Sequence, residues 1–513
     1  MNSENFKNIK GGSLINDSGF CSVAQSIIDD EWKRNDQSQA SLPSPNQQMQ
    51  PDRMEMASKA IPILIDLLVD EDTVVQKKAL DMVLQLSQET GSREMISDSP
   101  QLIAVLLDTL SKSNNLELIE NAAGILYNIS EHHLGRQTIH KLCGIPELIR
   151  ILSCDSESVI HLAISALHLL LLHQDGSREA VRLAQGLPVM VSLLFNPNEQ
   201  FLSIVIDCIR LLAYGDSETK LVINHLGGTN ELVGILKNSS YPHLLWVTCS
   251  TLKVLSACPI NKRAIIDCGG LQALSLQLNP NIDIHVGNCL FTIRNLSDAA
   301  VNEEGLDMLL SKVLEILQAT LADTATHEPT ITCVAGILSN LTCNQTNKKI
   351  VYELGGVELL VETIVALRAN NEIIEPAVCA LRHLTCRYFE AELAAHKIIQ
   401  CQGLVPIINL LHSRSWAIKK AVVGLIRNIA LCEANIVPLR EHFVIQKLAA
   451  VLEEANITAQ SYDIGGGIVS PVDPKIETII EEATSTLKIM AKDPLNKEMI
   501  DGIVCYFTNS VQI

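Results

Sequence analysis

Arg294-Asn295-Leu296-Ser297 ends an apolar helical pattern, and near copies of this four-residue stretch recur along the chain. The clear copies are Leu84-Gln85-Leu86-Ser87, Tyr127-Asn128-Ile129-Ser130, Ser339-Asn340-Leu341-Thr342, Arg382-His383-Leu384-Thr385 and Arg427-Asn428-Ile429-Ala430. Weaker copies place Leu169, Leu211, Val254 and Ile489 in the position of Asn295, which we call the slot. Successive slots lie 41 to 45 residues apart, except for a last step of 61, so the chain is built from internal repeats.

Glycines that precede a new apolar helix recur with a similar period, at Gly144, Gly186, Gly228, Gly270, Gly356 and Gly403. A period of about 42 without strand-like alternation predicts an all-α, right-handed superhelical solenoid of armadillo or HEAT repeats. Each glycine is expected in a tight turn that needs either a positive φ or the absence of a Cβ. The final helix of each repeat, which ends at the slot, is expected to line an extended groove.

The array is predicted over residues 56–513 as about ten repeats, behind a disordered regulatory tail at residues 1–55. The tail is rich in Ser, Asn and Gln, so it buries too little apolar area to offset the entropy of ordering. An inserted loop at about 456–475, marked by Gly465-Gly466-Gly467 and two prolines, explains the last slot step.

Composition narrows the classes of function. The net charge of −19 disfavours direct binding of nucleic acid or of an anionic membrane surface. No segment has the apolar length of a signal peptide or a membrane span, which predicts a soluble intracellular protein without membrane insertion. The 15 cysteines contain no C-x-x-C pair and sit singly in apolar patterns, so we expect reduced core residues.

The tail carries serines at strict four-residue steps, Ser18, Ser22 and Ser26, followed by Asp29 and Asp30. This spacing suits a kinase that reads a negative charge four residues after its target, so that each phosphate would prime the next serine. Chance is the alternative, because serine is common in disordered tails.

The predicted groove combines amides with basic side chains. An asparagine ladder of Asn128, Asn295, Asn340 and Asn428 could hold the backbone of an extended partner, or it could cap helix ends. Residues 201–430 hold 18 basic against 20 acidic side chains, so the acidity lies mostly outside this stretch. Such a groove should select extended acidic peptides. The basic residues that flank the slots are Lys220, Lys253, Arg294, Lys348, Arg382, Arg387, Lys420 and Arg427.

No pattern in the chain predicts catalysis. There is no P-loop, H-E-x-x-H motif or nucleophile elbow, so we expect no catalytic residues, no metal and no cofactor. His132-His133 near Cys143 could suggest a metal site, but a connection between helices is the favoured interpretation.

Several long stretches resemble the β-catenin family: residues 121–128, 211–215, 294–300, 335–343, 375–385 and 423–428. The resemblance implies binding to TCF/LEF-type transcription factors, cadherin cytoplasmic tails and APC- and axin-type scaffolds. It implies that Lys220 and Lys348 pair with acidic side chains of these partners, so that reversing either charge should cost most of the peptide affinity. The implied groove contacts are Tyr214, Lys220, Lys253, Phe291, Arg294, Asn295, Asn340, Lys348, His383, Arg387, Lys420 and Asn428, with Phe291 replacing the family's tryptophan.

The resemblance also implies two further sites. One is a first-repeat site for a coactivator helix, formed by Leu64, Leu67, Asp70, Asp72 and Leu86. The other is a phosphodegron read by an F-box ubiquitin ligase, formed by Asp17, Ser18, Gly19, Ser22 and Ser26.

Two departures from the family are expected to matter. We find no α-catenin-binding helix before the first repeat, so α-catenin is not an expected partner. The chain stops near Ile513, so the family's acidic transactivating tail is expected to be absent.

The combined interpretation is a non-enzymatic Wnt-pathway scaffold in cytoplasm and nucleus, with cell junctions as a further location. It would recruit coactivators, or compete with a full-length β-catenin. The alternatives are a cadherin-junction adhesion protein and, more remotely, a nuclear-import adaptor. The adaptor's groove carries Trp four residues before each Asn, where this chain has Gly124, Phe291, Gly336 and Gly424.

Overall fold

The computed structural model describes residues 51–279, 284–463 and 474–510, and we discuss the array that begins at Ile61. The described residues form helices and turns without a strand, which confirms the predicted all-α class. Most repeats contain three helices, the arrangement of armadillo rather than HEAT repeats. The predicted phosphodegron at residues 17–26 lies outside the described residues.

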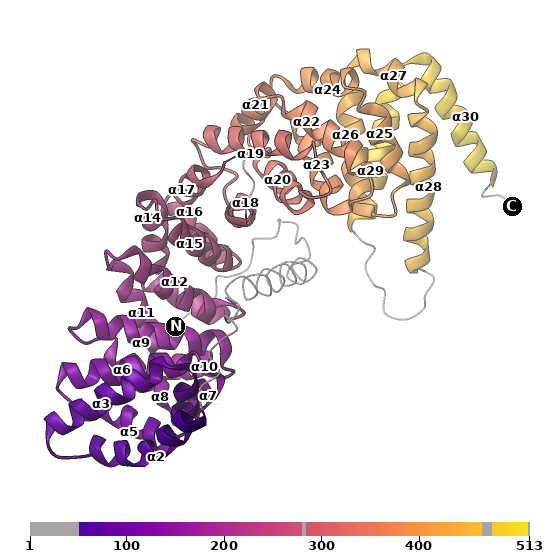
Figure 1. The fold of residues 1–513 in the computed structure, drawn as a ribbon. Coiled ribbons are helices and arrows are strands. Elements are labelled where there is room, and N and C mark those ends of the chain that lie inside the picture. Colours follow the sequence, from indigo (N-terminus) through magenta and orange to yellow (C-terminus); the bar gives the residue numbers. More distant parts are fainter. Residues whose placement is uncertain (1–50, 280–283, 464–473, 511–513) are drawn as a thin grey trace, which may run out of the picture. The chain divides into compact units, whose positions relative to one another are not determined.

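The third helices of the repeats pack against one another in chain order, and we call them the third-helix row (Figure 1). Each repeat therefore buries its apolar face on its neighbours, as expected for a solenoid. The row comprises α3 (Thr73–Gln88), α6 (Leu116–Ser130), α9 (Glu157–His173), α12 (Glu199–Ala213), α15 (Pro242–Leu255), α18 (Ile284–Ser297), α20 (Glu328–Leu341), α23 (Asn371–Leu384), α26 (Trp416–Ala430) and α29 (Pro474–Met490).

First and second helices complete most repeats. The first helices are α4 (Thr90–Ser97), α7 (His133–Lys141), α10 (Ser177–Leu183), α13 (Ser217–His225), α16 (Pro259–Asp267), α21 (Gln345–Glu353), α24 (Ala391–Gln400), α27 (Ile436–Glu441) and α30 (Pro494–Ser510). The second helices are α2 (Pro51–Leu68), α5 (Pro100–Lys112), α8 (Gly144–Ile151), α11 (Gly186–Ser192), α14 (Gly228–Asn238), α17 (Gly270–Gln277), α19 (Asp307–Thr320), α22 (Gly356–Ala366), α25 (Leu404–Asn409) and α28 (Val444–Asp463).

Polar caps in the sequence explain where several of the third helices begin. Asn115 accepts from the Glu117 amide at 3.0 Å, and Asn198 accepts from the Gln200 and Phe201 amides at 3.1 Å. These contacts satisfy amides that have no partner within a helix's first turn. Behind the caps the helices bury aliphatic side chains from both flanking repeats, which is why the chain has many aliphatic and few aromatic residues.

The repeated glycines open the second helices because a Cβ would not fit there. At Gly270 a Cβ would lie 2.4 Å from Ile265 Cγ2 and 2.6 Å from the Ile265 carbonyl oxygen. The positive φ belongs instead to the preceding residue, for example Gly269 at 78° and Gln185 at 54°. Of the two reasons considered from sequence, the structure therefore supports the absence of a Cβ.

The long last repeat contains more helix than the sequence indicates. The insertion is predicted from about residue 456, but α28 continues to Asp463 and α29 begins at Pro474. In the described part of the chain no single helix has the length and apolar composition to cross a membrane. Trp416–Ala430 and Glu433–Glu441 meet those criteria only together, as a pair bent by 116°.

Candidate binding face of the third-helix row

The four asparagines of the predicted ladder use their amide nitrogens to join neighbouring repeats. Asn295 Nδ2 donates to Ser256 Oγ at 3.0 Å, and Asn340 Nδ2 donates to Ser297 Oγ at 2.9 Å. Asn128 donates in the same way to Ser87 at 2.8 Å. The ladder is thus neither a helix cap nor a row of fully open amides, since Asn128, Asn295 and Asn340 each donate one N–H to the neighbouring repeat and keep a carbonyl oxygen and a second N–H for a partner.

Asn428 makes the same kind of contact, and its acceptor shows which residue in the preceding repeat pairs with a polar slot. Its Nδ2 donates to the Arg382 carbonyl oxygen at 2.9 Å and to Thr385 Oγ1 at 3.3 Å. Each accepting hydroxyl lies two residues after the slot of the preceding repeat. An asparagine in one slot is therefore paired with a serine or threonine in the repeat before it. The apolar slots Leu211 and Val254 follow Leu171 and Ala213 at this position, whereas the apolar slot Leu169 follows Ser130.

His383 occupies a slot and uses its ring in the same junction. Its Nδ1 lies 3.1 Å from the Ser339 carbonyl oxygen and 3.2 Å from Thr342 Oγ1. Burial, and to a lesser degree the charges of Arg382 and Lys348, lower the pKa of His383 from 6.5 to about 4. The ring is therefore neutral at physiological pH, and His383 is not one of the positive charges of this face.

The low pKa of His383 predicts a loss of stability in mild acid. An unfolded imidazole takes up its proton near pH 6.5 but the folded one only near pH 4, so stability falls as the pH drops between these values. From pH 6.5 to pH 5 the loss is about 2 kcal/mol. Urea unfolding at both pH values should show this loss shrinking in His383→Asn. The exposed His412→Asn should keep it, and equal pH dependence of the two variants would contradict the assignment.

Lys253 and Lys348, two of the predicted partner contacts, are buried. Lys253 Nζ donates to Asn288 Oδ1 at 3.0 Å and lies 5.0 Å from the ring centroid of Phe291. Lys348 Nζ donates to the Cys386 carbonyl oxygen at 2.7 Å. Burial lowers the pKa of Lys348. These two ammonium groups stabilise contacts between repeats before any partner arrives.

Lys220 on α13 and Lys420 on α26 are placed differently. Both side chains are partly exposed, and no hydrogen bond or ion pair to another described residue reaches either ammonium group. The Lys220 carbonyl holds the Asn261 amide at 2.9 Å, which anchors the Lys220 backbone to the next repeat. Of the predicted basic contacts, these two lysines and the exposed Arg387 are therefore the ones best placed to receive an external carboxylate.

Arginines in the row lie over glycines of the following repeat. A Cβ on Gly336 would come within 2.6 Å of Arg294 Nε, and one on Gly424 within 2.7 Å of Arg382 Nε. Burial lowers the pKa of Arg294, although nearby Cys333 and Glu372 oppose this. The positions that carry Trp in an import adaptor thus provide room for the preceding repeat's arginine.

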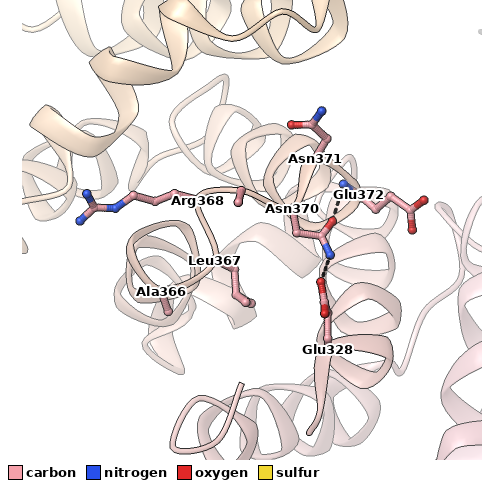
Figure 2. A pocket seen from close by; sticks show the side chains of 8 residues that line it. Glu328, Ala366, Leu367, Arg368, Asn370, Asn371 and Glu372 are labelled. Atoms are coloured by element: carbon pink, nitrogen blue, oxygen red, sulfur yellow. Dashed lines mark hydrogen bonds between the residues drawn. The ribbon is translucent and has the colours of Figure 1, made fainter. Parts of the chain in front are cut away.

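The other predicted groove residues lie beside these elements. Tyr214 follows α12, and the Arg178 guanidinium carbon lies 5.8 Å from its ring centroid. Phe291 is partly exposed on α18, and Arg387 is exposed in the turn after α23 with a φ of 57°. Figure 2 shows a separate pocket of about 510 Å³ near the start of α23. There Asn370 donates to the Glu328 carboxylate and accepts from the Glu372 amide, so its amide is already engaged.

In the first repeat, the predicted coactivator residues differ in exposure. Leu67 and Leu86 are partly exposed, whereas Leu64 is buried and can only support such a site from beneath. Asp70 and Asp72 are exposed. Asp70 accepts from the Asp72 amide and Asp72 caps α3 through the Val74 amide, both at 2.8 Å, so each retains a second carboxylate oxygen.

The sequence analysis missed a buried ionic cluster between α9 and α12. Asp207 Oδ2 lies 2.7 Å from His168 Nε2, and Asp207 Oδ1 accepts from Arg210 Nε at 2.7 Å. Burial alone would raise the pKa of Asp207, but Arg210 and His168 outweigh it and lower that pKa. An aspartate inside the apolar run of α12, three residues before an arginine, was the available signal.

Comparison with known proteins supports the fold. The chain is 46% identical over 459 residues to catenin beta of Urechis caupo and 45% identical over 450 residues to human junction plakoglobin. It is 47% identical over 458 residues to the armadillo segment polarity protein of Drosophila melanogaster. These matches cover 87 to 88% of the chain but only 54 to 60% of the relatives.

A solved structure is also similar. Its TM-score is 0.77 at 32% identity, and the match covers 85% of this chain and 81% of that one. It comes from work on a phosphorylation switch that controls the interaction between cadherin and β-catenin. No protein-family model matches the chain.

Proposed function

The chain belongs to the β-catenin family of armadillo-repeat proteins, and from this premise we propose that it is a non-enzymatic scaffold whose third-helix row binds extended acidic segments. A cadherin cytoplasmic tail is the leading partner, since the similar solved structure concerns cadherin and β-catenin. This assignment favours cell junctions as one location of the protein.

The observation that carries the proposal is the placement of Lys220 and Lys420. Both present partly exposed ammonium groups that no acidic side chain in the described part of the chain neutralises. Between them, α15 and α18 carry Lys253 and Arg294 and no acidic residue in their described bounds, whereas α20 and α23 carry Glu328, Glu372 and Glu375. An acidic segment lying along this row would meet positive charge at both ends, which favours its orientation and rate of association.

The same chemistry suits other acidic segments, so we extend the proposal to TCF/LEF-type transcription factors and to APC- and axin-type scaffolds. Such binding would give the protein a cytoplasmic and nuclear role as a coactivator recruiter or as a competitor. Recognition of the tail by an F-box ligase remains part of this wider proposal. A pull-down comparing a cadherin tail, TCF, axin and α-catenin separates adhesion from signalling.

Lys220→Glu should weaken binding of an acidic cadherin-tail peptide at least about tenfold, because it replaces attraction by repulsion on α13, at one end of the proposed binding stretch. Isothermal titration calorimetry at two salt concentrations measures this, and the wild-type affinity should fall with salt. Lys141→Glu, an exposed residue on α7, makes the same change in net charge and should have little effect. Equal losses in both variants, or none in Lys220→Glu, would refute the proposed face.

A further inference from the structure

Three metal-ligating side chains meet where α15 packs against α18. Cys249 on α15 and His285 and Cys289 on α18 each offer one ligand atom, and these atoms all lie within 4.8 Å of one another. The two sulfur atoms are 3.3 Å apart. Cys249 and Cys289 are fully buried, whereas His285 is partly exposed.

The helical geometry explains why these residues converge. His285 and Cys289 are four residues apart on one helix, so their side chains share a face. Cys249 comes from the helix of the preceding repeat, 40 residues earlier, which presents its thiol to that face. This set differs from His132, His133 and Cys143, which do not form a ligand cluster among the described residues.

The two sulfur atoms and one imidazole nitrogen are ligands that a thiophilic cation prefers. Two thiolates and one imidazole are ligands that Zn²⁺ and Cu⁺ take in preference to Mg²⁺ or Ca²⁺. Around a tetrahedral zinc ion, with bonds of about 2.3 Å to sulfur and about 2.0 Å to nitrogen, ligand atoms lie roughly 3.5 to 3.8 Å apart. The observed separations are close enough for side-chain rotation to close the site.

We propose that Cys249, His285 and Cys289 bind one thiophilic d¹⁰ metal ion, Zn²⁺ or Cu⁺, which links two consecutive repeats of the third-helix row. The two thiols release their protons to solvent as the sulfur–metal bonds form, and the imidazole binds in its neutral form. With Zn²⁺ a water molecule completes the tetrahedron, whereas Cu⁺ is satisfied by three ligands. The inference is independent of the proposed function, because it concerns the array itself.

The test uses the full chain, purified with a non-thiol reductant and freed of metal by chelation. Titration with Co²⁺ as the spectroscopic probe for zinc should give a thiolate charge-transfer band that saturates at one equivalent. Zn²⁺ should displace the Co²⁺ and raise the melting temperature. A parallel Cu⁺ titration against a competing chelator distinguishes the two metals by affinity.

His285→Asn and Cys289→Ser should each lower the affinity by more than about 100-fold, beyond what is typical for loss of a supporting residue outside the ligand set. Cys208→Ser, which alters a fully buried thiol on α12 outside the cluster, should bind like the wild type. Circular dichroism of each variant establishes that it is folded, and the partly exposed His285 makes its variant the safer test. Equal binding by the wild type and folded His285→Asn, or neither a Co²⁺ band nor competitive Cu⁺ binding in the wild type, would overturn the proposal.

Discussion

Lys348→Glu is expected to lower the free energy of unfolding by about 3–5 kcal/mol, a range typical of leaving a buried charge uncompensated. The Lys348 side chain is only 6% exposed, and its ammonium group lies 2.7 Å from the Cys386 carbonyl oxygen and 5.6 Å from the Tyr388 ring centroid. A carboxylate would face a carbonyl oxygen and the negative face of an aromatic ring. Both contacts that stabilise the lysine would then repel its replacement.

The sequence suggests reversing the charge of Lys348 to test peptide affinity. In the structure the same substitution is expected to destabilise the fold, so a loss of binding in Lys348→Glu would not by itself report a contact with the peptide. Urea unfolding followed by circular dichroism should show the loss in Lys348→Glu. The neighbouring Lys349→Glu should lose little, because Lys349 is 58% exposed and only 3.7 Å from Glu353 in a surface pair. Similar stability of both variants would contradict the buried role of Lys348.

Lys348→Met offers a way to test peptide binding at this position. An apolar side chain of similar length fills the site without burying a new charge, so the array should stay folded. A weaker affinity of folded Lys348→Met for an acidic peptide would then report a direct contribution of the ammonium group to binding.

Gly135→Ala is expected to destabilise the protein by about 3 kcal/mol or more, the upper range for overpacking. A Cβ at this position in α7 would lie 2.1 Å from the Ile129 carbonyl oxygen and 2.8 Å from its carbonyl carbon. The obstacle is backbone, which cannot rotate away as a side chain can. Relief requires α6 and α7 to separate, at the cost of their packed contacts.

Gly234→Ala is the matched control, since it is also a glycine inside a helix. No atom lies within 4 Å of its would-be Cβ, so the substitution should stabilise α14 by up to about 1 kcal/mol. Thermal and urea unfolding should therefore shift in opposite directions for the two variants. Shifts of the same sign and size would show that close approach at Gly135 is not limiting.

The sequence by itself determined the repeat period, the all-α class, the recurring glycines and the slot positions at the ends of the third helices. These features are local, because propensity, capping and apolar spacing act within one repeat. The slots therefore fall at the ends of the third helices, where the pattern places them, and the turn glycines of α14 and α17 lie at the first residue of each helix.

Only the tertiary structure decided what each polar side chain of the predicted groove does. Asn295, His383 and Lys348 look like open binding groups in sequence, yet each is engaged by a neighbouring repeat. Lys220 remains open in the described array, and Cys249 meets Cys289 across 40 residues. The physical reason is that these contacts join residues about one period apart, so they depend on the chemistry and approach of two repeats together. A pattern read along one repeat contains no information about how far its side chains reach into the next.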